Sequence, residues 1–107
     1  MPTEIRNDTE NDKYVIEIDG TEAGFAAYHI RSGPLYFFYH TVVHDEFGGK
    51  GTGSQLARGA LDDVRANGGS IVPLCPFIAA WLKRHPEYDD MVDHEIWERV
   101  SKKSDDG

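Results

Sequence analysis

The sequence predicts an α/β (α+β) domain with a mixed sheet. Three antiparallel strands are expected to lead to a central strand, a glycine turn and a helix, followed by a splayed strand and a second helix. Short β-rich runs separated by turn residues fill the first 43 residues, and helix-period apolar positions begin directly after glycines at 48, 49, 51 and 53. A length of 107 residues predicts one domain, spanning 1–107.

The first three strands are expected at 4–8, 14–18 and 23–30. The second run is rich in β-branched and aromatic residues, and its apolar residues alternate along the strand. Asp-Gly at 19–20 and Ser-Gly-Pro at 32–34 are turn sequences. Short connections of this kind join strands that pair antiparallel.

The central strand is expected at 35–43, where Leu-Tyr-Phe-Phe-Tyr-His-Thr-Val-Val is apolar at both alternating sets of positions. This pattern is typical of strands that are covered on both faces, so we expect cover on both. After the glycines, apolar residues recur with the period of a helix until Gly68-Gly69 ends it. The buried face of this helix is predicted to hold Gly53, Leu56, Ala57, Ala60, Leu61 and Val64.

A short strand and a second helix are expected next. The strand at 70–74 contains Pro73, which lacks an N–H group and cannot pair fully with a neighbouring strand. Pro76 is favoured at the first position of a helix, because the missing N–H would be unpaired there anyway. Pro86 ends this helix after about Arg84.

The end of the chain is expected to form a last short helix at 94–102. Asp93 would cap this helix, because its carboxylate accepts hydrogen bonds from N–H groups of the first turn. The tail from about residue 103 is expected to fray, since chain ends have few neighbours.

Composition bounds the partners and the compartment. A net charge of −8 repels nucleic acid and anionic membranes and favours cationic partners, although solubility or salt adaptation explains it equally well. No run of eighteen apolar residues exists and the N-terminus lacks the order of a signal peptide. A lone Cys75 fits a reducing cytoplasm. We therefore expect a cytoplasmic protein that binds neither nucleic acid nor membrane, as a monomer or weak homodimer.

The glycine stretch predicts an anion site, because a glycine turn at a helix start exposes N–H groups without Cβ cover. Two common phosphate-binding patterns do not fit it. A P-loop needs a glycine where His44 stands and a hydroxyl residue where Gly51 stands. A dinucleotide fingerprint needs a third glycine where Ser54 stands.

The order of strand, glycine turn and helix resembles that of the GNAT N-acetyltransferase superfamily. Its pattern, Gln/Arg-x-x-Gly-x-Gly/Ala, matches at Gly51 and Gly53 and departs at Gly48. The resemblance is closer to minimal members of about a hundred residues. Those are similar in His-Thr at 40–41, Pro-x-Cys-Pro-Phe at 73–77 and His-Pro-Glu-Tyr at 85–88, and the likeness covers about residues 5–92.

The resemblance implies that two central strands splay apart and that acetyl-coenzyme A (acetyl-CoA) lies between them. Val42 and Val43 would offer strand-edge groups to the pantetheine amides, and Phe77 would touch the pantetheine arm. The turn and helix start would hold the pyrophosphate through Gly48, Gly49, Lys50, Gly51, Thr52, Gly53 and Ser54.

Two side chains are candidates for catalysis, Cys75 and His40. A helix N-terminal cap favours the thiolate of Cys75, which would accept the acetyl group, line the thioester site without bonding, or simply be a small buried thiol. His40 would take a proton from the amine or from Cys75, or would be a core histidine with a satisfied hydrogen bond. Trp81 and Tyr88 are expected to be structural.

The sequence therefore predicts an acetyl-CoA-dependent N-acetyltransferase that acts on a primary amine of a small molecule or a protein. One alternative is a coenzyme A-binding module with little or no transferase activity. Another is a structural protein whose glycine turn only connects a strand to a helix. No metal site is predicted, because the histidines lack metal-ligand spacing.

Overall fold

The computed structural model describes residues 3–31, 33–48 and 51–106, and within them five strands form one sheet in chain order. The first four strands pair antiparallel and the last two pair parallel, which confirms the predicted mixed sheet. The strands are β1 (Thr3–Asp8), β2 (Lys13–Ile18), β3 (Thr21–Arg31), β4 (Leu35–Val43) and β5 (Ser70–Pro73). The helices are α1 (Thr52–Ala66), α2 (Pro76–Arg84) and α3 (His94–Asp106), with short 3-10 helices η1 (Asp45–Phe47) and η2 (Pro86–Met91).

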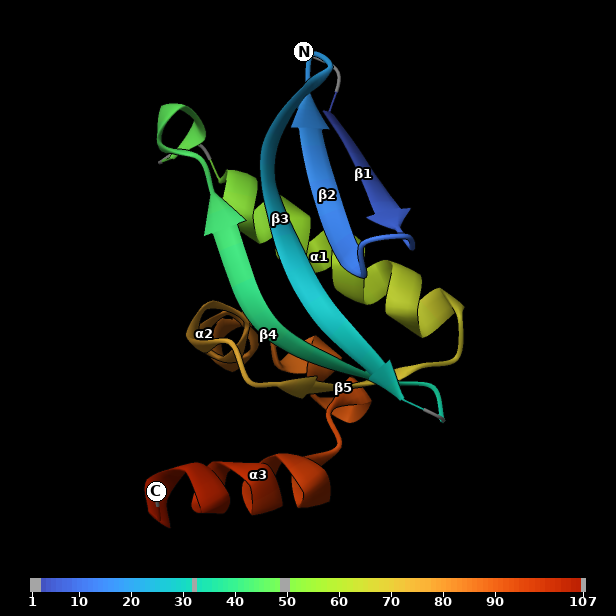
Figure 1. Ribbon diagram of the computed structural model, residues 1–107, viewed down its shortest axis with the longest axis vertical. Coiled ribbons are helices and arrows are strands. Elements are labelled where there is room, and N and C mark those ends of the chain that lie inside the picture. The colour runs from blue at the N-terminus through green and yellow to red at the C-terminus, as the bar shows by residue number, and fades with distance from the viewer. Residues whose placement is uncertain (1–2, 32, 49–50, 107) are drawn as a thin grey trace.

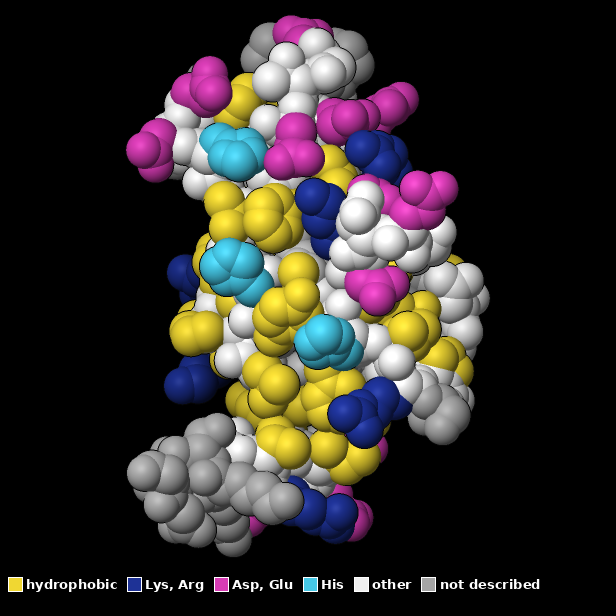
Figure 2. All heavy atoms as spheres, in the orientation of Figure 1, with side chains coloured by type: hydrophobic (Ala, Val, Ile, Leu, Met, Phe, Trp, Pro, Cys, Tyr) yellow, Lys and Arg dark blue, Asp and Glu magenta, His cyan; other side chains and the backbone are white. Residues whose placement is uncertain are grey.

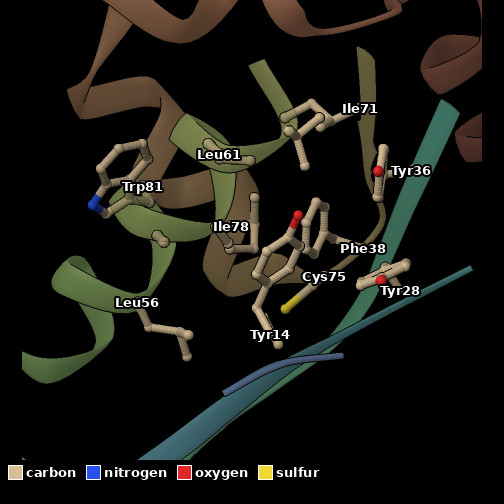
Figure 3. Close-up of a cluster of buried hydrophobic side chains, with 14 of the residues drawn as sticks. Tyr14, Tyr28, Tyr36, Phe38, Leu56, Leu61, Ile71, Cys75, Ile78 and Trp81 are labelled. Atoms are coloured by element: carbon tan, nitrogen blue, oxygen red, sulfur yellow. The ribbon is translucent and has the colours of Figure 1, made fainter. Parts of the chain in front are cut away.

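The core lies between the sheet and α1, which runs across one face of the strands (Figure 1). The predicted apolar face of α1 is confirmed from Leu56 to Val64. It meets aromatic side chains of β2, β3 and β4, namely Tyr14, Tyr28, Tyr36 and Phe38. Their contacting rings have centroids 5.1 to 6.4 Å apart. Figure 3 shows these rings together with Cys75 and with Trp81 and Ile78 of α2.

The expectation that both faces of β4 are covered is wrong. In the described part of the chain no helix lies over the opposite face of β2, β3 and β4 (Figures 1 and 2). Tyr39 on this face is 44% exposed. The aromatic residues cover one another instead, because Tyr39 stacks on His29 and the Arg31 guanidinium lies over Phe37.

The C-terminal elements lie beside β5. The backbone of Val92 forms a parallel bridge with Ile71, and Asp93 N–H donates to the Ile71 carbonyl at 2.9 Å, so this segment covers part of the outer edge of β5. The predicted cap of α3 is confirmed, since Ile96 N–H donates to the Asp93 carboxylate at 3.1 Å. The predicted end of this helix is too early, because the helical backbone continues to Asp106.

None of the described helices is long and apolar enough to cross a membrane.

Candidate active site

The strands β4 and β5 separate partway along β4. Their parallel pairing ends at Phe38 and Pro73, and Cys75 N–H still donates to the Phe38 carbonyl at 2.9 Å. Beyond that point no described strand pairs with this side of residues 39–43 of β4, here called the open edge. Pro73 has no N–H to offer, which ends the ladder where the sequence predicts it. The predicted splay is confirmed.

Three elements meet beside the open edge. α1 begins after Gly51, whose φ of 74° lies in the left-handed region that glycine adopts without strain. A Cβ added at Gly53 would lie 2.6 Å from Cζ of Phe77 and 3.4 Å from Cγ2 of Val43. The start of α1, the start of α2 and the end of β4 are therefore in contact, and a side chain at position 53 would displace one of them.

The two hydroxyl side chains at the start of α1 have different partners. Thr52 is 2% exposed and donates to the Phe47 carbonyl at 3.1 Å, so its proton is already used. Ser54 Oγ accepts a hydrogen bond from Nε1 of the fully buried Trp81 at 2.9 Å. Since Ser54 acts as the acceptor in that bond, its own proton stays available for another group.

The backbone N–H groups of residues 51–54 are the first donors of α1, which no turn of the helix can satisfy. The described part of the chain provides no acceptor for them. By contrast, Gly48 N–H donates to the Asp45 carbonyl at 3.1 Å and is already engaged. Gly49 and Lys50, which the sequence places in the same cradle, lie outside the described residues.

Cys75 lies at the base of the splay. It occupies the N-cap of α2 in extended conformation and is 4% exposed. Its Sγ donates to Oγ1 of Thr41 at 3.2 Å, which joins the start of α2 to the open edge of β4. The geometry accordingly pairs Cys75 with Thr41, a residue that sequence reasoning noted only as part of the His-Thr motif.

His40 lies on the other face of β4. Neighbouring residues of a strand point to opposite faces, so contact between Thr41 and Cys75 turns His40 away from the thiol. The His40 ring instead meets Phe25 across the strand pair, with ring centroids 5.9 Å apart. Among the described residues no hydrogen bond joins His40 to Cys75. The two predicted catalytic residues therefore lie on opposite sides of the sheet, although Cys75 contacts Thr41, the residue next to His40.

The two valines of the open edge present different backbone groups to the splay. The carbonyl oxygen of Val42 lies against Gly24 of β3, so the backbone groups of Val42 face β3. Because backbone groups of successive residues point to alternate sides of a strand, those of Thr41 and Val43 face the open edge. Val43 is thus the better placed of the two predicted valines to bond a ligand lying there.

Two residues that the sequence assigned to the structure are buried as expected. Trp81 stacks on His85, with ring centroids 3.9 Å apart. The Tyr88 hydroxyl donates to Asp62 at 2.6 Å and accepts from Arg58 at 3.2 Å. Burial first, and then the bond to Asp62, raise the pKa of Tyr88. These contacts attach η2 to α1 and support a structural role.

Two polar side chains near the end of β4 contact each other. His44 lies 3.1 Å from the carboxylate of Glu22, which gives this loop histidine a partner outside the splay. Within the described residues no group of three or more His, Cys, Asp or Glu side chains is arranged to hold a metal ion.

Strands that part beside a glycine-bounded helix start, with a second helix start opposite, define an acetyltransferase type of α/β fold. The chain belongs to the GCN5-related N-acetyltransferase family, whose model matches residues 13–91. It is also similar to the NMR solution structure of a GCN5-like protein of proposed N-acetyltransferase activity from Staphylococcus aureus. That match has a TM-score of 0.64 and 26% identity, and it covers 83% of this chain and 86% of the other. No curated protein matches the chain. The predicted family and fold are confirmed.

Proposed function

We propose that this protein transfers the acetyl group of acetyl-CoA to a primary amine. The observation that carries the proposal is the separation of β4 from β5 at the place where α1 and α2 both begin. Two helix N-termini carry partial positive charge toward the same region, which favours an anionic ligand there. Family membership supplies the class of reaction, and the acceptor is part of the proposal.

The residues present fit acetyl-CoA. The free N–H groups of residues 51–54 would bind its pyrophosphate, with the Ser54 hydroxyl as an additional donor. Gly53 has no side chain, so Phe77 and Val43 pack directly against the backbone of this first turn and hold it in place. The backbone groups of Val43 would bond the pantetheine amides. Gly49 and Lys50, which the sequence assigns to the same cradle, would add further donors, whereas the Gly48 N–H already donates to the Asp45 carbonyl.

Acetyl-CoA supplies an activated thioester, and transfer forms the amide C–N bond, breaks the C–S bond and releases coenzyme A as its thiol. His40 would take the proton that a protonated amine must lose before its lone pair can react. Cys75 and Thr41 lie on the opposite side of β4, where they would line the thioester end of the site. Direct attack would therefore take place in the gap between β4 and β5, which the amine would enter from the side of His40, because the reacting atoms must come within about 3.5 Å of each other.

Substitution of His40 and Cys75 tests the site. We expect His40→Ala to lower kcat by about 10²-fold, the lower end of general-base effects. Cys75→Ala should lower it less if the thiol only lines the site. The measurement is release of coenzyme A thiol with a panel of amines, with Lys83→Ala on exposed α2 surface as the control. Unchanged turnover in both variants would refute the site assignment.

The covalent route has its own test. Intact mass after exposure to acetyl-CoA, without amine, would show a gain of one acetyl group on Cys75 if the thiol is a nucleophile. We expect no such gain, because the Cys75 thiol is buried and hydrogen-bonded to Thr41. If acetyl-CoA raises the melting temperature but no amine releases thiol, the protein is a binding module instead of an efficient transferase.

A further inference from the structure

The His-Pro-Glu-Tyr sequence at 85–88, which the proposed function leaves without a role, begins where α2 ends. A proline disfavours helical backbone at the residue before it, and His85 accordingly leaves the helix, with φ of −132° and ψ of 68°. Its N–H still donates to the Leu82 carbonyl at 3.1 Å. The His85 ring turns back along α2 and reaches Trp81, which lies one helical turn earlier.

His85 contacts Trp81 in two ways. Its Nδ1 lies 2.8 Å from the Trp81 carbonyl oxygen, and because a carbonyl only accepts, Nδ1 carries the proton and donates it. This carbonyl belongs to the last turn of α2, whose carbonyl groups have no partner within the helix. The hydrogen bond orients the His85 ring, which lies flat on the indole with centroids 3.9 Å apart and planes tilted by 14°.

Two further side chains restrict the position of the Trp81 indole. The Arg58 guanidinium lies over the indole, 5.6 Å from the ring centroid. The Tyr88 ring lies 5.2 Å away, and its hydroxyl accepts a hydrogen bond from Arg58 at 3.2 Å. Together with His85, these side chains help to bury the indole completely, and Figure 3 shows it beside α1.

The indole in turn orients a hydroxyl group in the first turn of α1. Its Nε1–H donates to Ser54 Oγ at 2.9 Å, and because an indole N–H can only donate, Ser54 is held as the acceptor. The hydroxyl proton of Ser54 then stays available beside the unpaired N–H groups of residues 51–54. Without the indole, the Ser54 hydroxyl would rotate more freely, and ordering it on a ligand would cost entropy.

Given the acetyl transfer proposed above, we propose that His85 is a positioning residue for the pyrophosphate of acetyl-CoA. His85 holds the Trp81 indole, the indole holds Ser54 as an acceptor, and the Ser54 proton donates to a phosphate oxygen. His85 itself touches neither the ligand nor the reacting atoms. It therefore changes the Kd of acetyl-CoA and the KM, but neither kcat at saturating acetyl-CoA nor the Kd of acetyl-pantetheine, which lacks the pyrophosphate.

Calorimetric titration of His85 variants of the full chain with acetyl-CoA tests this inference. We expect His85→Ala to raise the Kd about fivefold, which is part of the roughly tenfold effect of a hydrogen bond to a charged group. His85→Phe keeps a ring that can stack on the indole and should recover most of the affinity. The matched control is His94→Ala, because His94 lies beside the other tryptophan, Trp97, with ring centroids 6.0 Å apart.

Two more measurements show whether His85 acts through the indole and Ser54. In a Ser54→Ala background, His85→Ala should raise the Kd of acetyl-CoA no further. Hydrogen exchange of the Trp81 indole N–H, followed by NMR without ligand, should be faster in His85→Ala and unchanged in His94→Ala. If His85→Ala does not fold, His85→Gln takes its place, because glutamine keeps a donor for the Trp81 carbonyl but has no ring.

The results separate this inference from the proposed function. Equal affinity of the wild type and His85→Ala for acetyl-CoA would overturn the inference and leave the proposed function intact. The same holds for a further loss in the Ser54→Ala background, an equal loss for acetyl-pantetheine, no recovery in His85→Phe, or unchanged exchange of the indole N–H. Failure of the wild type to bind acetyl-CoA would instead refute the proposed function, and the inference with it.

Discussion

Cys75 and His40 lie on opposite sides of the sheet because Thr41 and His40 of β4 point to opposite faces. Thr41 contacts Cys75 on the core side, and His40 contacts Phe25 on the other side. A histidine on the far face is poorly placed to deprotonate the thiol and well placed to receive a proton from an amine that arrives there. At the scale of residues, the geometry therefore favours His40 as a base for the acceptor.

Tyr14 makes a pH-dependent contribution to stability. Its hydroxyl donates to Asp63 at 2.7 Å. Burial first, and then this hydrogen bond, raise the pKa of Tyr14 above its ordinary value of 10.0. Burial acts in the same direction on the pKa of Tyr28 and Tyr36. Because the folded-state pKa is the higher one, the contribution is fully present below about pH 10 and is lost as pH rises above it.

We predict that the free energy of unfolding is lower at about pH 10.5 than at about pH 8, as measured by urea unfolding. Tyr14→Phe removes the hydrogen bond to Asp63, so it should lower the free energy of unfolding by about 1 kcal/mol near pH 8. The same variant should show a smaller decrease toward alkaline pH, because one group that resists ionisation in the fold is gone. A decrease as large as that of the wild type would contradict this explanation.

At the scale of elements, α1 and α2 are fixed relative to each other beside the splay. The Trp81 indole of α2 donates to Ser54 of α1, and Phe77 of α2 fills the space above Gly53. Both contacts lie in the first turn of α1, where the free N–H groups are. Helix α2, whose N-cap is Cys75, thereby sets the position of the start of α1, which would bind the pyrophosphate.

A double-mutant cycle measures this connection. Trp81→Phe keeps an aromatic ring but removes the N–H, and Ser54→Ala removes the acceptor. We expect each to cost about 1 kcal/mol in the free energy of unfolding, and the double variant to cost less than the sum. Acetyl-CoA should bind more weakly to each variant, whereas acetyl-pantetheine, which lacks the pyrophosphate, should bind all of them equally. Additive losses, or an equal loss for both ligands, would show that the bond has no such role.

At the scale of the whole molecule, most of the architecture follows from sequence patterns. The turn sequences at 19–20 and 32–34 predict hairpins, and the periodic apolar residues after Gly51 predict the buried face of α1. Pro73 and Pro76 mark the place where one strand stops pairing and a helix begins. These signals are local, because each depends on the backbone preferences of a few neighbouring residues.

The features that the sequence did not reveal depend on long-range geometry. A strand that is apolar at both alternating sets of positions gives no sign of a bulge such as the one that Tyr39 forms in β4. The sequence therefore could not show which face of the sheet the side chains of Tyr39, His40 and Thr41 take. The same pattern suggested cover on both faces, but rings and cations on β3 supply part of that cover themselves. The bond from Trp81 to Ser54 joins residues 27 positions apart, which helical period alone does not identify.

The claim that connects all three scales is that acetyl-CoA lies along the open edge of β4 with its pyrophosphate at the start of α1. Amide NMR spectra with and without acetyl-CoA test it most directly. We predict shifts at Thr41, Val43, residues 51–54 and Cys75, with little change on β1 or the exposed surface of α3. Absence of shifts, or shifts confined to residues away from the open edge, would contradict the account.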